Sequence, residues 1–157
     1  MQVAVCGPRN CSDQDKINAY EVGQLLAQAG CTVICGGGSG VMAAVAAGVR
    51  SKNGLIIGIR PNDSTTGASP DLSAVIVTNM GEARNAVIVW SADAVIAIGG
   101  SWGTLSEIAL AKRRGGIPVV SLGGWAILRQ DGQQVDDAVL SAQSPQESVE
   151  LALRGRH

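Results

Sequence analysis

The chain has 157 residues, of which 46% are apolar and 16% charged, and its formal net charge is -1. This length is most simply one domain, residues 1–157, with enough apolar residues to bury an ordinary core. The near-neutral charge, without a basic stripe, argues against a nucleic-acid partner. The lack of a long apolar stretch or a signal-like N-terminus argues against membrane insertion and for a cytoplasmic location.

Short apolar runs rich in β-branched residues alternate with segments of helical periodicity. The apolar runs are continuous rather than alternating, as expected of strands that are covered on both faces. In chain order we expect strand 3–7, helix 14–29, strand 32–36, helix 40–51, strand 55–59, strand 74–78, helix 81–91, strand 94–99, helix 103–114, strand 117–122 and helix 145–153. The polar stretch 60–73 predicts an exposed loop, and 123–143 is ambiguous, with room for a short strand and a turn. The pattern predicts an α/β, Rossmann-like three-layer α/β/α fold with a mostly parallel sheet of six or seven strands.

Three glycine-bearing joints follow expected strands: CGPRN (6–10), CGGGSG (35–40) and GGSWGT (99–104). Ligands of open parallel sheets lie at the carboxyl ends of the strands, and helix starts offer free N–H groups to anions. The joints therefore predict a small phosphorylated ligand, although a single glycine turn before a helix often has a purely structural reason. Neither a Walker A motif nor a spaced dinucleotide fingerprint is present. A nucleoside monophosphate or a pterin phosphate fits better than ATP or NAD.

The residue types that usually bind metals are sparse. Cys6, Cys11, Cys31 and Cys35 lack zinc-site spacing and are expected to be inert thiols, some of them buried. The only histidine, His157, is the last residue, which argues against a histidine-dependent triad or a histidine-ligated metal within one chain. We therefore expect no metal site.

Several separated motifs occur in order: CGGGSGVMAAVAAGV (35–49), GIRP (58–61) and MGEARNAVIVWSADAVIAIGGSWGTLSE (80–107). With these motifs the chain resembles the LOG/lysine-decarboxylase-like superfamily over roughly residues 3–122. Within it, the chain is most similar to the branch that includes the molybdenum cofactor carrier proteins. The resemblance implies a Rossmann-like fold, a homodimer or homotetramer, and no required cofactor. It implies as bound ligand an AMP-like nucleotide, phosphate or molybdenum cofactor, which is a phosphorylated pterin.

The two branches imply two functions. The carrier branch implies a nucleotide- or phosphopterin-binding protein. The LOG branch implies a phosphoribohydrolase that cleaves a nucleoside 5'-monophosphate, such as AMP or a cytokinin riboside monophosphate, to free base and ribose 5-phosphate. This sequence has Gly99, Ser101 and Asn85 where the LOG branch has proline, glycine and lysine, and its MGEAR interval is one residue longer. These departures favour the carrier branch.

The resemblance also implies site residues. Arg84 and Glu107 match the catalytic positions of the LOG branch. The candidate ligand-binding residues are Gly7, Gly36, Gly37, Gly38, Gly40, Asn85, Gly99, Gly100, Ser101, Trp102, Gly103 and Thr104.

Each polar candidate has a functional and a structural interpretation. Glu107 could stabilise a ribosyl cation and deprotonate the attacking water, or it could be the acceptor of a capping box in TLSE (104–107). Arg84 could hold a phosphate with two parallel hydrogen bonds, or be a solvated helix charge. Trp102 could stack on a base or pterin ring, or cover the rim of the pocket.

Overall fold

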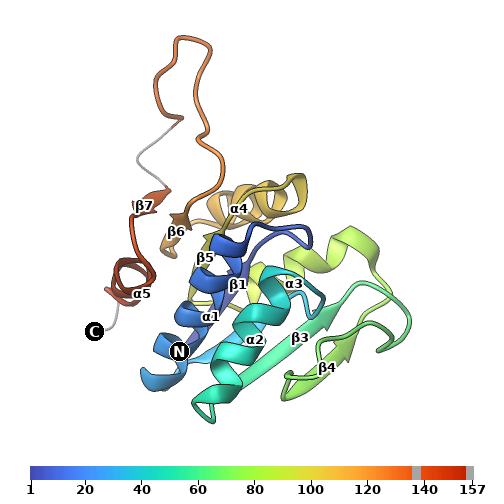
Figure 1. Cartoon of the computed structure of the whole chain (residues 1–157). Coiled ribbons are helices and arrows are strands. Elements are labelled where there is room, and N and C mark those ends of the chain that lie inside the picture. The colour runs from blue at the N-terminus through green and yellow to red at the C-terminus, as the bar shows by residue number, and fades with distance from the viewer. Residues whose placement is uncertain (136–138, 155–157) are drawn as a thin grey trace.

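Seven strands form one sheet in the order β4-β3-β2-β1-β5-β6-β7 in the computed structural model, which describes residues 1–135 and 139–154 (Figure 1). Every strand pairing in this sheet is parallel. The strands are β1 (Gln2–Cys6), β2 (Thr32–Cys35), β3 (Leu55–Arg60), β4 (Ala74–Val77), β5 (Ala94–Ile98), β6 (Val119–Leu122) and β7 (Leu140–Ala142). The predicted α/β fold is confirmed, with seven strands.

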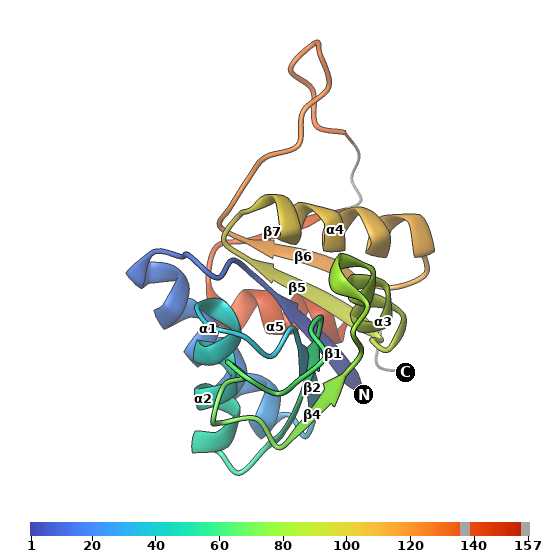
Figure 2. The same ribbon diagram turned by 90° about the vertical axis from the view of Figure 1, so that its right-hand side faces the viewer.

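Helices cover both faces of the sheet (Figures 1 and 2). They are α1 (Asp13–Gln28), α2 (Val41–Ser51), α3 (Arg84–Trp90), α4 (Trp102–Arg114) and α5 (Pro145–Leu153). One core lies beneath α1, α2 and α5, and a second lies beneath α3 and α4. Val3 and Val5 of β1 point into the first core, whereas Ala4 and Cys6 point into the second. The central strands β1, β2 and β5 are buried on both faces, so they contain no polar alternation.

Two predicted segments differ from the structure. Residues 81–91 do not form one helix: a 3₁₀ turn, η1 (Gly81–Ala83), precedes α3, because Gly81 has a φ of 56° that an α-helix does not accommodate. In the ambiguous segment, β7 is the extra strand. Residues 123–135 leave the sheet as a projecting hairpin, closed by a bridge between Leu128 and Gln134 (Figure 1). Residues 136–138 of that segment and His157 lie outside the described residues.

Close packing of α1 against α2 depends on two glycines. A Cβ atom at Gly23 would lie 2.5 Å from the carbonyl oxygen of Val45, and one at Gly48 would clash with the carbonyl oxygen of Tyr20. In both cases the obstacle is backbone, which cannot rotate away as a side chain can. The two helices therefore approach to backbone contact on this face.

Gly48→Ala is expected to lower the free energy of unfolding by about 2 kcal/mol, because the added methyl group must push α1 and α2 apart. Urea unfolding measures this loss of stability. Gly103→Ala in α4 is the matched control, because its Cβ atom would have no neighbour closer than 3.8 Å. The control should be neutral or slightly stabilising through helix propensity. Equal stability of both variants would contradict this account of the packing.

The strand order places the carboxyl ends of β3, β2, β1 and β5 side by side along one edge. The chain proceeds from β1 outward in one direction through β2 and in the other through β5, so the connections diverge between them. Such a switch point is where open α/β sheets bind ligands. No described helix is long and apolar enough to cross a membrane.

Candidate functional site

Arg84 lies buried at the start of α3, with its guanidinium group against the glycine loop that follows β2. Its Nη1 donates hydrogen bonds to the carbonyl oxygens of Gly36, at 2.9 Å, and Ile59. Its Nε donates to Oδ1 of Asn85 at 2.9 Å. Burial lowers the pKa of Arg84, and the charge of Glu107 acts in the opposite direction. Arginine nevertheless stays charged in proteins, so the site contains a fixed buried cation, and Arg84 is not a solvated helix charge.

Glu107 is buried in the second turn of α4 and interacts with Cys6, the last residue of β1. Burial raises its pKa to about 7, while a hydrogen bond from the Cys6 thiol and the charge of Arg84 lower the pKa. The carboxyl and the Arg84 guanidinium influence each other electrostatically but do not form an ion pair. A carboxyl group with this pKa can accept or donate a proton near neutral pH.

The start of α4 is capped by Ser101, whose Oγ accepts a hydrogen bond from the Thr104 N–H at 3.1 Å. Because Ser101 is the N-cap, the capping-box interpretation of Glu107 is wrong: Glu107 lies three residues beyond the position that such a box requires. Asn85 is buried between α3 and α4, where its Nδ2 donates to Oγ of Ser106 at 3.0 Å. This amide therefore links the helix of Arg84 to the helix of Glu107.

Other parts of the protein approach the Gly99–Gly100 turn closely. A Cβ atom at Gly99 would lie 3.0 Å from the carboxyl carbon of Asp15, and one at Gly100 would lie 2.6 Å from Cδ1 of Trp125. Trp102 is 79% exposed and packs edge-to-face on Trp125, with ring centroids 4.9 Å apart. The glycines here accommodate α1 and the projecting hairpin. The carboxyl group of Asp15 disfavours an anion beside Gly99.

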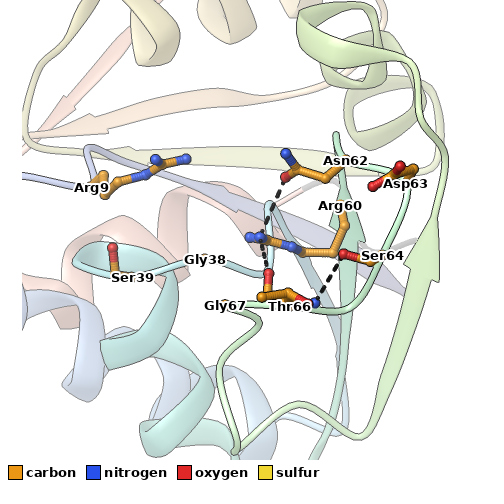
Figure 3. A pocket seen from close by; sticks show the side chains of 9 residues that line it. All are labelled: Arg9, Gly38, Ser39, Arg60, Asn62, Asp63, Ser64, Thr66 and Gly67. Atoms are coloured by element: carbon orange, nitrogen blue, oxygen red, sulfur yellow. Dashed lines mark hydrogen bonds between the residues drawn. The ribbon is translucent and has the colours of Figure 1, made fainter.

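A cavity of about 490 Å³ opens further along the same edge, next to the carboxyl end of β3 (Figure 3). Its walls include Arg9 from the loop after β1, Gly38 and Ser39 from the loop after β2, and Arg60 from the end of β3. The segment 62–67 closes the remaining side. The segment predicted as an exposed loop is thus a wall of the cavity, and the Ser69 N–H fixes it to the glycine loop through the Gly37 carbonyl at 3.1 Å.

The predicted site residues divide into groups in space. Gly36, Arg84 and Asn85 are in direct contact, and Glu107 lies on the same edge. Gly38 lines the cavity, whereas Glu107 and Arg84 do not. The space above Gly7, Gly36 and Gly40 is filled by Val41, Met42 and the backbone of Arg9.

Arg9 and Arg60 were not among the predicted site residues. Both occur in motifs noted in the sequence, CGPRN and GIRP, at or just after the end of an expected strand. An arginine at the carboxyl end of a parallel strand is the signal that identifies them.

Comparison with known proteins identifies the family of this chain. The sequence model of the SLOG cluster4 family matches residues 1–149. The chain belongs to the SLOG cluster4 family. A relative in this size range, an uncharacterized protein of Archaeoglobus fulgidus, is 44% identical over 116 residues, which are 73% of this chain and 76% of the relative.

Solved structures extend the comparison of this SLOG cluster4 chain. The molybdenum cofactor binding protein of Rippkaea orientalis is 36% identical, with a TM-score of 0.84 over 96% of this chain and 93% of that one. A molybdenum cofactor carrier protein of Chlamydomonas reinhardtii is 27% identical, with a TM-score of 0.80 over 97% of both chains. The resemblance inferred from the motifs is confirmed by these matches.

The fold alone is shared more widely. DNA processing protein A of Helicobacter pylori, which binds single-stranded DNA, has a TM-score of 0.73 at 18% identity over 100% of this chain and 82% of that one. At this identity the two proteins share the fold alone.

Proposed function

We propose that this SLOG cluster4 protein binds a phosphorylated pterin, molybdenum cofactor, as cargo and carries it without transforming it. The supporting observation is a group of three arginines, Arg9, Arg60 and Arg84, around the glycine loop after β2. None of them has a carboxylate partner among the described residues, where the one ion pair joins Lys16 to Asp13. Arg60 and Arg84 are buried, whereas Arg9 is exposed at the cavity wall. Buried guanidinium groups need a counter-charge, and the geometry of a guanidinium group matches phosphate oxygens.

The residues present fit such a cargo. The cavity volume of about 490 Å³ lies within the range of small-molecule sites and exceeds what phosphate alone would fill. The guanidinium groups of Arg9 and Arg60, which line the cavity, supply donors for the phosphate end. Among the described residues there is no cluster of three histidine, cysteine, aspartate or glutamate side chains able to hold a metal ion. The molybdenum would therefore arrive bound to the pterin as part of the cargo. The similarity to the two molybdenum cofactor proteins supports the same conclusion.

A second candidate function is a nucleoside 5'-monophosphate phosphoribohydrolase. The observation that favours it is a carboxyl group, that of Glu107, which has a pKa of about 7 and interacts electrostatically with the Arg84 cation. Glu107 would take a proton from water as the oxygen attacks C1', and the base would leave with the electrons of the N-glycosidic bond. We place it second because Glu107 does not line the cavity and Nη1 and Nε of Arg84 already donate to protein oxygens.

The two functions separate in one experiment. The purified chain is incubated with molybdenum cofactor released from a molybdoenzyme and passed through gel filtration, and the retained pterin is quantified by fluorescence. A parallel sample receives AMP, and free adenine is measured. We expect retention of the cofactor and no adenine. Adenine release that stops in Glu107→Gln would instead establish the hydrolase, and neither signal would overturn both proposals.

Other predictions from the sequence accompany the proposal. A single-stranded oligonucleotide is expected not to bind, because the net charge is -1. The single domain, the homodimer or homotetramer and the cytoplasmic location remain predictions.

A further inference from the structure

We infer that Arg60 and Arg9, together with the Gly38–Ser39 turn, bind a tetrahedral oxyanion: the phosphate monoester end of the cargo. This inference rests on the proposed function and names the part of the cavity that recognises the phosphate. Neither residue belongs to the Arg84–Glu107 pair implied by the family resemblance.

The first observation is an uncommitted buried cation. Arg60 is only 6% exposed, and its Nη2 donates to the Thr66 carbonyl at 3.0 Å and to Oδ1 of Asn62 at 3.4 Å. Its Nε is buried without any hydrogen-bond partner. A buried donor without an acceptor costs free energy. The 62–67 segment thus fixes the guanidinium plane and leaves part of its hydrogen-bonding capacity for a ligand.

The second observation is the backbone beside this guanidinium. A Cβ atom at Gly38 would lie 3.2 Å from Nη1 of Arg60, so the backbone of this glycine runs directly beside the guanidinium group. Ser39, which follows, is exposed at the cavity wall. The first N–H of α2, that of Val41, is already used by the Pro8 carbonyl at 3.1 Å. The anion would therefore be held mainly by guanidinium groups rather than by the start of this helix.

The third observation is the distribution of charge. Arg9 reaches across the cavity toward the side where Arg60 lies (Figure 3). The charge of Arg60 also helps to lower the pKa of Arg84, so the cations at this edge repel one another. An anion between them would relieve that repulsion. Asp63 also lines the cavity, but it forms no ion pair with either arginine, and in Figure 3 it lies beyond Asn62 as seen from Arg9.

The Gly99–Thr104 loop is the alternative position for the phosphate, and the surroundings disfavour it. The Asp15 carboxyl group lies against Gly99, and Trp125 covers Gly100. Of the two glycine loops, the one after β2 is bordered by unpaired cations and the one after β5 is bordered by a carboxylate. The geometry therefore assigns the oxyanion to the β2 loop.

The test uses the full chain with inorganic phosphate and ribose 5-phosphate as probes in calorimetric titrations, and with ribose as the unphosphorylated reference. Arg60→Gln and Arg9→Gln should each weaken binding of both phosphate probes at least tenfold. Arg50→Gln, at an exposed position on α2, should leave binding unchanged. Because Arg60 is buried, circular dichroism checks the fold. Ser39→Glu places a repulsive charge at the exposed cavity wall and should weaken binding equally without touching the core.

Different outcomes separate the two proposals. Phosphate binding that survives Arg60→Gln and Ser39→Glu, or that is lost only in Arg84→Gln, overturns this assignment. Unchanged cofactor retention in Arg60→Gln also overturns it but leaves the proposed function standing. A third outcome is that the unmodified chain retains no cofactor, while phosphate binds it and is lost in the cavity variants. This outcome supports the oxyanion site and overturns the proposal that the cargo is molybdenum cofactor. If neither phosphate probe binds the unmodified chain, the oxyanion site is wrong.

Discussion

Glu107→Gln is expected to stabilise the folded chain at pH 8 far more than at pH 5. Burial raises the pKa of Glu107 from 4.5 to about 7, so the folded chain holds this proton more tightly than the unfolded chain does. Between these two pKa values, unfolding releases a proton, and stability falls as the pH rises. Above the folded-state pKa the loss is complete. For the unmodified chain, the free energy of unfolding is therefore expected to fall by about 2–3 kcal/mol between pH 5 and pH 8 through Glu107.

Urea unfolding of the unmodified and variant chains at both pH values measures this effect. Glutamine keeps the size of the side chain but does not titrate, so the stability difference between the two chains should grow with pH. Glu21→Gln, at an exposed position on α1, is the matched control and should show no such growth. A constant difference at both pH values would mean that Glu107 is not protonated in the folded chain near neutral pH.

Arg84→Met should lower the free energy of unfolding by about 3 kcal/mol and weaken cofactor retention, because Arg84 holds the Gly36 carbonyl of the glycine loop that borders the cavity. The methionine side chain retains most of the apolar stem but leaves the carbonyl oxygens of Gly36 and Ile59 without their donor. Each unpaired buried acceptor costs about 1–3 kcal/mol. Lysine should not restore stability, because a single ammonium group does not reproduce the fork of the guanidinium.

Chemical denaturation and the gel-filtration assay together measure both parts of this prediction. Arg113→Met is the control, since Arg113 is an exposed residue near the end of α4 and its replacement should change stability by at most about 0.5 kcal/mol. Unchanged stability of Arg84→Met would show that the two carbonyl groups find other partners. Destabilisation with full cofactor retention would restrict Arg84 to a structural role.

The sequence predicted the elements closely because their signals are local. In β1, valines face one core while Ala4 and Cys6 face the other, and a strand buried on both faces is recognisable from its own residues. The helix boundaries fell within a residue or two for similar reasons. The segment 81–91 was the exception, since nothing local indicated that Gly81 would adopt a positive φ and delay the helix to Arg84.

The candidate site was predictable only in part. The motifs place Arg84 and Glu107 in the first two turns of helices that follow strands, and the fold brings them to one edge, where their charges interact. That Arg60 belongs to the candidate site is visible only in the folded chain. Its guanidinium lies beside Gly38 because β3 pairs with β2. Its Nη2 is held by the 62–67 segment, which the sequence predicts only to be an exposed loop.

The sequence by itself determined the alternation of strands and helices, and with it a parallel sheet with glycine loops at one edge. Hydrophobic periodicity and glycine placement are properties of neighbouring residues, so they can be identified without the fold. Which glycine loop is open to an anion was decided by the tertiary structure. That depends on the strand order and on side chains distant in sequence, with Asp15 and Trp125 closing one loop and Arg9 and Arg60 bordering the other.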